Sequence, residues 1–388
     1  MGIKGLLKNL SKIFLITLPA LAVAAISAEI LLRIKIPSQE KEAYLNDSLA
    51  WKVSGIHKLD ADFLYTMIPG KKGADESEEY RENFSINSAG FRDEEIDEKA
   101  TKSKKMFMVG DSFTYGAGIS SNTKTLPKLL EKFLNQSKTK KGNVKVYNAG
   151  ISGYGPDQEY RLITRKLIPE YKPDYIFWNL VIPSDLYDAS IASNWPIPAL
   201  YGLKNKQLVE YDARLNWFYP RNFIYQKGPA FLRSSLLAAA FFRFLSDQPI
   251  LNRQPGISDD ALLLWAAQKI GLQAAVLQSM AETDKSGFMV VFLPNKDYWT
   301  YTGRENYGKA LELIEKKLNE KKVKFSDITK LAGEGQAAFS GQYPKDWYYK
   351  ENFHPNEIGV LKFAELVAID FFKKNPGWQA EDRGGVLE

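Results

Sequence analysis

Residues 105–116 read KMFMVGDSFTYG, and this stretch decides the fold. A short apolar run that ends in glycine is typical of a strand buried in a parallel sheet. In such sheets, ligands bind outside the carboxyl ends of the strands. A serine there can begin a helix, whose free backbone N–H groups stabilise a developing oxyanion. Ser112 is therefore the candidate nucleophile, although the tripeptide alone is also explained as a turn with a serine cap.

Segments typical of strands and of helices alternate along the rest of the chain. Further strands are expected at 144–150, 175–181 and 288–295, with a weaker one at 323–328. Helices are expected at 123–134, 157–167, 261–280, 307–317 and 356–373. Strands that alternate with helices predict a parallel sheet covered on both faces.

An insertion at about 186–260 interrupts this order. It is rich in aromatic residues and proline, and it contains the apolar run LLAAAFFRFL at 236–245. That run predicts a buried or pocket-lining helix. Its aromatic rings would suit stacking on sugar faces, and equally an acyl chain.

The N-terminus carries a candidate membrane anchor. Ile13–Ala28 contains no charged residue, and a helix over about 10–33 would be long enough to cross a bilayer. Lysines at 4, 8 and 12 favour a cytoplasmic N-terminus, and Glu29 falls near the outer end, where a carboxylate can reach headgroups. The alternative is a secretory signal peptide, cleaved at the small residues of AAISAE at 24–29.

Composition excludes several kinds of site. The chain has 388 residues and a net charge of +6, with acidic residues interspersed among the basic ones, so no nucleic-acid partner is expected. It has no cysteine, which excludes disulfides, thiol nucleophiles and cysteine metal sites. His57 and His354 are the only histidines, so any imidazole base is one of these two. His57 lies in the polar stretch 37–104 and is expected at the surface.

His354 lies in ENFHPNEIG at 351–359, before a proline and the closing helix. A carboxylate at the spacing of Glu351 can fold back on the ring and hold its Nδ1–H. Nε2 is then left to take a serine proton. Asp346 could substitute for Glu351 if the loop bends. The alternative is a histidine that merely begins a helix.

Taken together, these segments resemble the SGNH, or GDSL-type, hydrolase family. The first block matches as Gly110-Asp111-Ser112, the second in YNAGISGYG at 147–155, and the last as Glu351-x-x-His354-Pro355-Asn356. The resemblance covers roughly residues 105–373. NSAGFRDEE at 87–95, behind an N-terminal anchor, is similar to the lead-in of bacterial membrane-anchored members.

The resemblance implies a three-layer α/β/α flavodoxin-like domain with a parallel sheet at 105–375. This domain follows a transmembrane anchor at 1–36 and an extracytoplasmic stalk or lead-in at 37–104, and it precedes a tail at 376–388. The backbone N–H groups of Ser112 and Gly153 would hold the oxyanion, with Asp111 as an acceptor for loop N–H groups. No metal and no organic cofactor are implied.

The chain departs from the family pattern in its third block, usually Gly-x-Asn-Asp. Ser184 stands where the oxyanion asparagine is expected, and a hydroxyl can still donate one hydrogen bond. Asn179 is an alternative donor, but it lies inside a strand pattern. Asp185 and Asp188 are expected either to bind substrate or to brace the loop. Glu351 also departs from the pattern, because the family has aspartate there.

The resemblance implies a serine esterase or O-acyltransferase that acts on an acylated envelope glycan or lipid. We expect a single-pass protein of the bacterial inner membrane with its catalytic domain in the periplasm, or a secreted protein if the leader is cleaved. The competing interpretation is a weakly active or inactive envelope assembly or glycan-binding protein on the same fold. The missing third-block asparagine favours it, and the presence of both Ser112 and His354 opposes it.

Overall fold

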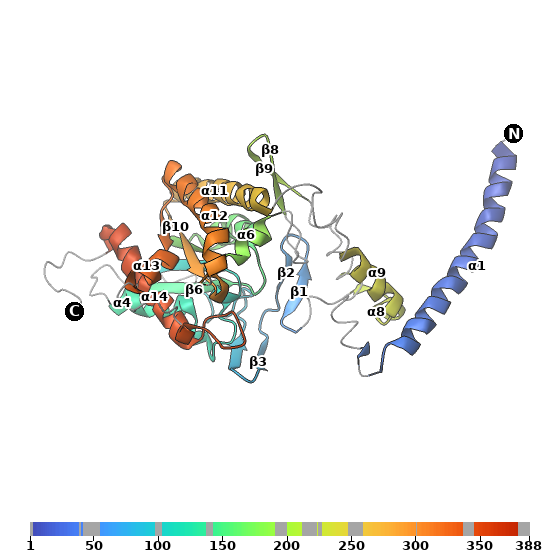
Figure 1. Cartoon of the computed structure of the whole chain (residues 1–388), viewed down its shortest axis with the longest axis horizontal. Helices are drawn as coiled ribbons and strands as arrows, with labels where there is room; N and C mark the ends of the chain where they lie inside the picture. The colour runs from blue at the N-terminus through green and yellow to red at the C-terminus, as the bar shows by residue number, and fades with distance from the viewer. Residues whose placement is uncertain are drawn as a thin grey trace.

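The computed structural model describes residues 3–38, 40–41, 55–97, 103–136, 143–190, 200–211, 223, 227–246, 259–299, 301–336 and 345–378. Most of the predicted tail at 376–388 lies outside these residues. Figure 1 shows an α/β body with a long N-terminal helix beside it.

Five parallel strands form the central sheet, in the order β11-β10-β7-β5-β6. They are β5 (Ser103–Gly110), β6 (Asn143–Gly150), β7 (Tyr175–Ile182), β10 (Gly287–Pro294) and β11 (Phe325–Asp327). Numbered along the domain, this is the order 2-1-3-4-5 of the flavodoxin-like fold. The predicted α/β class and parallel sheet are therefore confirmed.

Helices cover both faces and make three layers. One face carries α4 (Leu126–Gln136), α13 (Ile328–Gln336) and α14 (Glu357–Lys374). The other carries α5 (Pro156–Leu162) with its π-helical continuation η2 (Ile163–Tyr171), α11 (Asp259–Thr283) and α12 (Tyr301–Glu320). Shorter helices are α3 (Ser112–Tyr115), η1 (Asn122–Lys124), α6 (Ser184–Ala189), η4 (Lys296–Trp299), η5 (Lys345–Trp347) and η6 (Pro376–Trp378).

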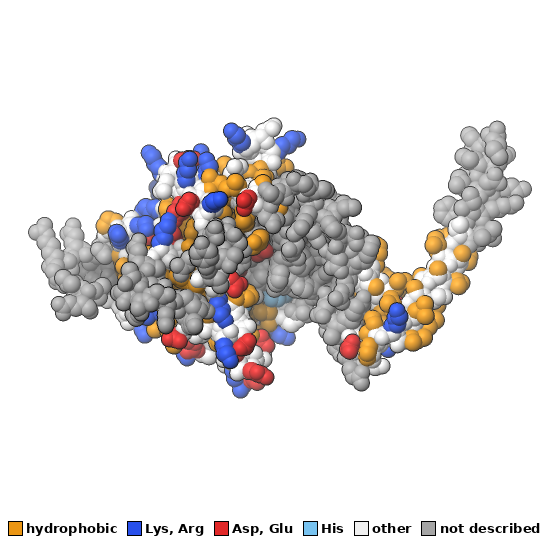
Figure 2. Space-filling model, in the orientation of Figure 1, with side chains coloured by type: hydrophobic (Ala, Val, Ile, Leu, Met, Phe, Trp, Pro, Cys, Tyr) orange, Lys and Arg blue, Asp and Glu red, His pale blue; other side chains and the backbone are white. Residues whose placement is uncertain are grey.

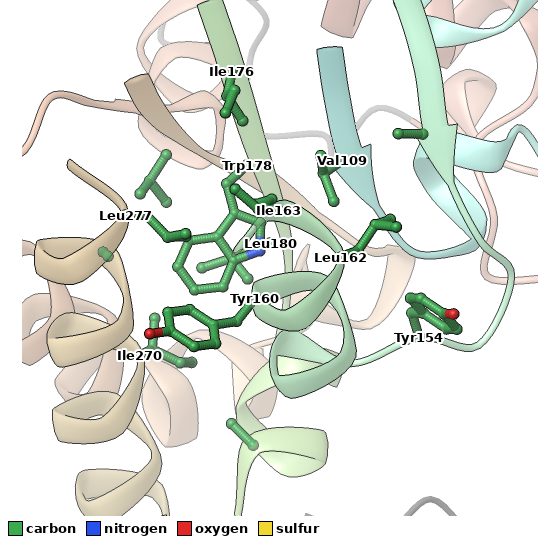
Figure 3. Close-up of a cluster of buried hydrophobic side chains, with 14 of the residues drawn as sticks. Val109, Tyr154, Tyr160, Leu162, Ile163, Ile176, Trp178, Leu180, Ile270 and Leu277 are labelled. Atoms are coloured by element: carbon green, nitrogen blue, oxygen red, sulfur yellow. The ribbon is translucent and has the colours of Figure 1, made fainter. Parts of the chain in front are cut away.

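Strand alternation explains the two cores. Along β5, Phe107 and Val109 face the α5–α11 side, whereas Met106 and Met108 face α4 and α14. Figure 3 shows the first core, where Trp178 of β7 packs among side chains of α5, η2 and α11. Each fully buried aliphatic side chain there stabilises the fold by about 1.5–3 kcal/mol relative to an exposed one.

The lead-in packs onto this domain. Residues 55–97 form two hairpins, β1 (His57–Asp60) with β2 (Leu64–Met67) and β3 (Lys72–Glu76) with β4 (Arg81–Ser85). Tyr65 is fully buried, and the half-buried His57 ring packs edge-on against it at 5.2 Å between ring centroids. The expectation that His57 is a surface residue is therefore wrong, because the segment that carries it is folded against the core.

The N-terminal helix α1 runs from Ile3 to Lys35, and its part Thr17–Lys35 is long and apolar enough to cross a membrane. The insertion contains the hairpin β8 (Tyr201–Lys204) with β9 (Gln207–Glu210), then α8 (Ala230–Arg233) and α9 (Leu236–Ser246). The apolar run of α9, predicted to be buried or pocket-lining, is buried only in part: Leu236 and Ala239 are buried, whereas Phe241 is 55% exposed. Among the described elements, α9 packs against α1 (Figure 1), because Glu29 of α1 binds its first turn.

Candidate active site

Ser112 begins α3, directly after the carboxyl end of β5. Asp111 caps this short helix, because its Oδ1 accepts the N–H of Phe113 at 2.8 Å. Gly116 ends it with φ +90°, a conformation that favours glycine. A Cβ on Gly150 would lie 2.2 Å from the backbone nitrogen of Tyr115, so only glycine lets β6 end against this turn.

His354 lies in the loop between η5 and α14, and its Nε2 is 2.7 Å from the Oγ of Ser112. Asn356 fixes the start of α14, since its Oδ1 accepts the N–H groups of Ile358 and Gly359. The His354 ring stacks on Phe353 at 4.2 Å between centroids and lies 5.4 Å from the ring of Phe113. The fold thus brings together two candidates that are 242 positions apart in the sequence.

Asn352 determines which nitrogen of the His354 ring is protonated. Its Oδ1 accepts the backbone N–H of His354 at 3.1 Å, which identifies this atom as the amide oxygen. The same Oδ1 lies 2.6 Å from Nδ1 of the ring, so Nδ1 carries a proton and donates it. Nε2 is then unprotonated and accepts the hydroxyl proton of Ser112.

The structure corrects the expectation for Glu351. Its side chain is 76% exposed and lies 3.6 Å from the ammonium of Lys350, while Asn352 occupies the position at Nδ1. Asp346 does not replace it in the part of the chain described here: it is exposed, and its backbone carbonyl accepts from the side chain of Asn356 at 2.8 Å. Glu79 accepts the backbone N–H groups of Lys350 and Glu351, the two residues before Asn352.

The turn with Gly153 follows the carboxyl end of β6, which pairs with the end of β5 just before Ser112. Gly153 has φ +78° in a turn closed by a 3.0 Å bond from the N–H of Tyr154 to the carbonyl of Ile151. Within the described ranges, neither the N–H of Ser112 nor that of Gly153 donates to another protein atom. Both are therefore available to a bound group.

Ser184 is the first residue of α6, at the carboxyl end of β7. Its Oγ accepts a long hydrogen bond of 3.4 Å from Nδ2 of Asn295, which follows β10. Asn179, the alternative donor, lies inside β7, and its Nδ2 donates a hydrogen bond to the hydroxyl of Thr114 at 2.8 Å. It therefore braces α3 against β7, as its position in the strand suggested.

Asp185 supports the turn beneath the site. Its buried carboxylate accepts the N–H of Val181 at 2.5 Å. Burial raises the pKa of Asp185 well above its ordinary value, and the nearby Glu159 raises it further. Burial likewise raises the pKa of Glu159, whose carboxyl accepts the indole N–H of Trp178 at 2.8 Å. Asp185 therefore stabilises the turn as a hydrogen-bond acceptor, and its raised pKa favours the neutral carboxyl.

The lead-in braces the turn that carries Ser112 through Arg92 and Glu82. The buried guanidinium of Arg92 donates to the carbonyls of Gly116 and Ile119 and lies 3.3 Å from the carboxylate of Glu82. Glu82 in turn accepts the hydroxyl of Tyr115 at 2.7 Å and the N–H of Gly118 at 2.8 Å. This pair holds the backbone that follows Ser112.

Glu79 braces the histidine loop from the same hairpin. Its Oε1 accepts the N–H groups of Lys350 at 2.6 Å and Glu351 at 3.0 Å. The ring of Tyr80 lies 5.3 Å from that of Tyr349, whose hydroxyl donates to the carbonyl of Gly118 at 2.7 Å. Neither Glu79 nor Tyr80 could be predicted as part of the site, because the polar run at 70–83 is typical of an exposed loop. For Arg92, the only indication in the sequence was its place in the NSAGFRDEE segment at 87–95.

Replacing Arg92 by methionine is expected to lower the free energy of unfolding by about 3 kcal/mol, since it leaves the buried carboxylate of Glu82 without its cation. Urea denaturation of the full chain in detergent would measure this change. Arg81→Met is the matched control, because Arg81 is 69% exposed on the hairpin that carries Glu82 and should change stability little. Equal losses in the two variants would contradict the bracing role.

The chain is similar to several solved structures. One is a lipase/acylhydrolase from Enterococcus faecalis, with 14% identity over 72% of this chain and 100% of that one, and a TM-score of 0.39. A second is an acetylxylan esterase from Geobacillus stearothermophilus, with 12% identity over 72% and 97% of the two chains and a TM-score of 0.39. A third is a psychrotrophic esterase from Pseudoalteromonas, with 11% identity over 71% and 99% and a TM-score of 0.37. No family model and no curated protein sequence matches the chain.

Proposed function

We propose that this chain is a serine ester hydrolase of the SGNH type, with Ser112 as nucleophile and His354 as general base. One observation carries the proposal: His354 Nε2 lies 2.7 Å from Ser112 Oγ, and the contact of Nδ1 with Asn352 Oδ1 makes Nε2 the proton acceptor of that pair. This is the hydrogen-bonded pair that activates a serine. The two unengaged N–H groups of Ser112 and Gly153 support it from the oxyanion side.

In the proposed reaction, Ser112 Oγ attacks the ester carbonyl carbon while its proton passes to His354 Nε2. The N–H groups of Ser112 and Gly153 stabilise the resulting oxyanion. The tetrahedral intermediate collapses as His354 returns the proton to the leaving alcohol. Water, activated by the same nitrogen, then releases the acid and restores Ser112. A second alcohol in place of water would make the reaction an acyl transfer.

The proposed substrate is an acylated glycan or lipid of a bacterial envelope. An apolar helix at the N-terminus supports a retained anchor, and the lysines before it support a cytoplasmic N-terminus with the domain in the periplasm. Phe353 is 42% exposed beside His354 and can contact an acyl chain or a sugar face.

The proposal is tested with the full chain in phosphatidylcholine vesicles. We expect a fluorophosphonate probe to label one serine, and the protein to hydrolyse members of a panel of acetyl esters, long-chain esters and acetylated glycans. Addition of free alcohols separates hydrolysis from transfer. A folded protein that neither reacts with the probe nor turns over any ester would favour a non-catalytic binding protein on the same fold.

Ser184→Ala is expected to lower kcat by roughly ten- to a thousandfold, with a smaller change in KM. The Ser184 hydroxyl accepts from Asn295, so its own proton is free to donate to charge that develops in the transition state. Steady-state kinetics on the best ester of the panel measure the change, and Ser184→Asn should retain or raise activity. Unchanged kinetics in Ser184→Ala would remove Ser184 from the oxyanion hole.

A further inference from the structure

Glu29, the acidic residue within the apolar part of α1, binds the start of another helix. Its carboxylate accepts the N–H of Leu237 at 2.8 Å, the N–H of Leu236 at 3.2 Å and the hydroxyl of Ser235 at 2.9 Å. The two backbone N–H groups are among the donors that a helix leaves unpaired in its first turn. Glu29 therefore caps α9 from 206 to 208 positions away in the sequence.

Further contacts attach the α8–α9 segment, residues 230–246, to α1. Arg33 donates to the carbonyl of Ser234 at 2.7 Å and pairs with Glu29 at 2.8 Å. Leu236 and Ala239, one turn apart on α9, are buried. The alanines at 238–240 are small enough to let two helices approach closely.

The rest of this helix pair exposes apolar side chains. Phe231 is 70% exposed and Phe241 is 55% exposed, on α8 and α9. The neighbouring surface of α1 is also apolar and more than half exposed, at Leu18, Leu21, Val23, Ile26, Ile30, Leu31 and Ile34. Figure 2 shows hydrophobic side chains gathered along the described part of α1, away from the charged side chains of the α/β body. A patch of this kind marks a lipid or protein contact.

The length of α9 decides how it meets a bilayer. Its 11 residues span roughly 16 Å, about half the hydrocarbon thickness. It cannot cross the membrane, and its capped end is tied to the outer part of α1. We propose that the α8–α9 segment is a second membrane-contacting element, which lies in the boundary between headgroups and acyl chains beside α1, with Phe231 and Phe241 in lipid. This rests on the proposed membrane anchor.

The arrangement has a consequence for the active site. The insertion that carries the segment leaves the sheet at α6, next to Ser184, and returns through α11. The protein would therefore contact the bilayer at two places: through α1, and through the α8–α9 segment of the insertion that leaves the catalytic edge. Cleavage after Ala28 would remove most of α1, the helix against which α9 packs.

The chain contains no cysteine, so single-cysteine variants carry a label at one position only. We would label Phe231→Cys and Phe241→Cys with an environment-sensitive fluorophore, in the full chain reconstituted in phosphatidylcholine vesicles. Leu21→Cys is the control within the span. Ile369→Cys is the aqueous control, because Ile369 is 55% exposed on α14 of the domain. Doxyl-labelled lipid and aqueous iodide serve as quenchers.

Labels at 231 and 241 should be quenched by doxyl lipid to an extent comparable with Leu21 and protected from iodide, while 369 shows the reverse. Quenching by iodide alone at 231 and 241 would overturn the proposal, as would protection from both quenchers, which indicates a protein contact. If the label at position 21 is also quenched by iodide and not by doxyl lipid, the result would instead overturn the membrane anchor. Glu29→Ala should reduce doxyl quenching at 231 and 241 without changing it at 21, and unchanged quenching would overturn the docking role of Glu29.

Discussion

Ser112→Ala is expected to abolish covalent labelling by a fluorophosphonate and to lower kcat for ester hydrolysis by a factor on the order of 10⁴ or more. The alanine has no oxygen to form an acyl-enzyme, and His354 loses the hydroxyl whose Oγ lies 2.7 Å from its Nε2. The remaining rate would come from the oxyanion N–H groups and from substrate binding alone. Mass spectrometry of the probe adduct and steady-state kinetics measure the two losses.

The fold should tolerate this change. Ser112 is small and 8% exposed, and α3 keeps its Asp111 cap, so the urea midpoint of Ser112→Ala should match that of the wild type. Ser121→Ala is a suitable control, because Ser121 is nearby in the chain and its hydroxyl contacts only Thr123 among the described residues. Full labelling of Ser112→Ala, or equal loss in Ser121→Ala, would place the nucleophile elsewhere.

The positions of Ser112 and His354 could be predicted because the signals are local. An apolar run that ends in glycine indicates a buried strand, and a helix start after it lies at the catalytic edge of a parallel sheet. The closing helix returns to the same edge, so a histidine before it is brought near. Alternation of strands and helices was likewise enough for the α/β class, since it needs no knowledge of distant contacts.

The choice between Glu351 and Asn352 could not be predicted in this way. Both are polar residues close to His354, and either can reach a ring nitrogen from a loop. The conformation of the loop that carries His354 depends on Glu79. Its carboxylate binds the backbone N–H groups of Lys350 and Glu351, although it lies more than 270 positions away in the sequence. Sequence spacing contains no information on that contact.

The run that forms α9 shows a second such case. An apolar helix can be buried in a protein core or in lipid, and its composition is the same in both surroundings. Its surroundings follow from the hydrogen bonds that Glu29 makes to residues 235–237, which join a segment before β5 to a segment after β7 in the sequence. The sequence places Glu29 near the outer end of the span, but it does not identify it as a helix cap.

His354→Ala is expected to lower kcat by about 10⁴- to 10⁶-fold, because Ser112 loses its proton acceptor. His57→Ala is the matched control for a histidine: its ring packs on Tyr65 in the lead-in, so it should retain activity and lose some stability. An equally large loss of kcat in a folded His57→Ala protein would contradict the assignment of the base.

Variants of Asn352 and Glu351 then test how the base is oriented. Asn352→Ala should lower kcat by roughly ten- to a hundredfold with little change in KM, because the ring loses the acceptor that holds Nδ1–H at 2.6 Å. Asn352→Asp should retain or raise kcat, since a carboxylate accepts the same proton and also stabilises the imidazolium that forms during attack.

Glu351→Ala should be nearly neutral, because the Glu351 side chain is 76% exposed and lies beside Lys350. Steady-state kinetics on one ester would compare all three variants. A large loss in Glu351→Ala together with a neutral Asn352→Ala would return the orienting role to Glu351, and would mean that the loop changes its conformation when substrate binds.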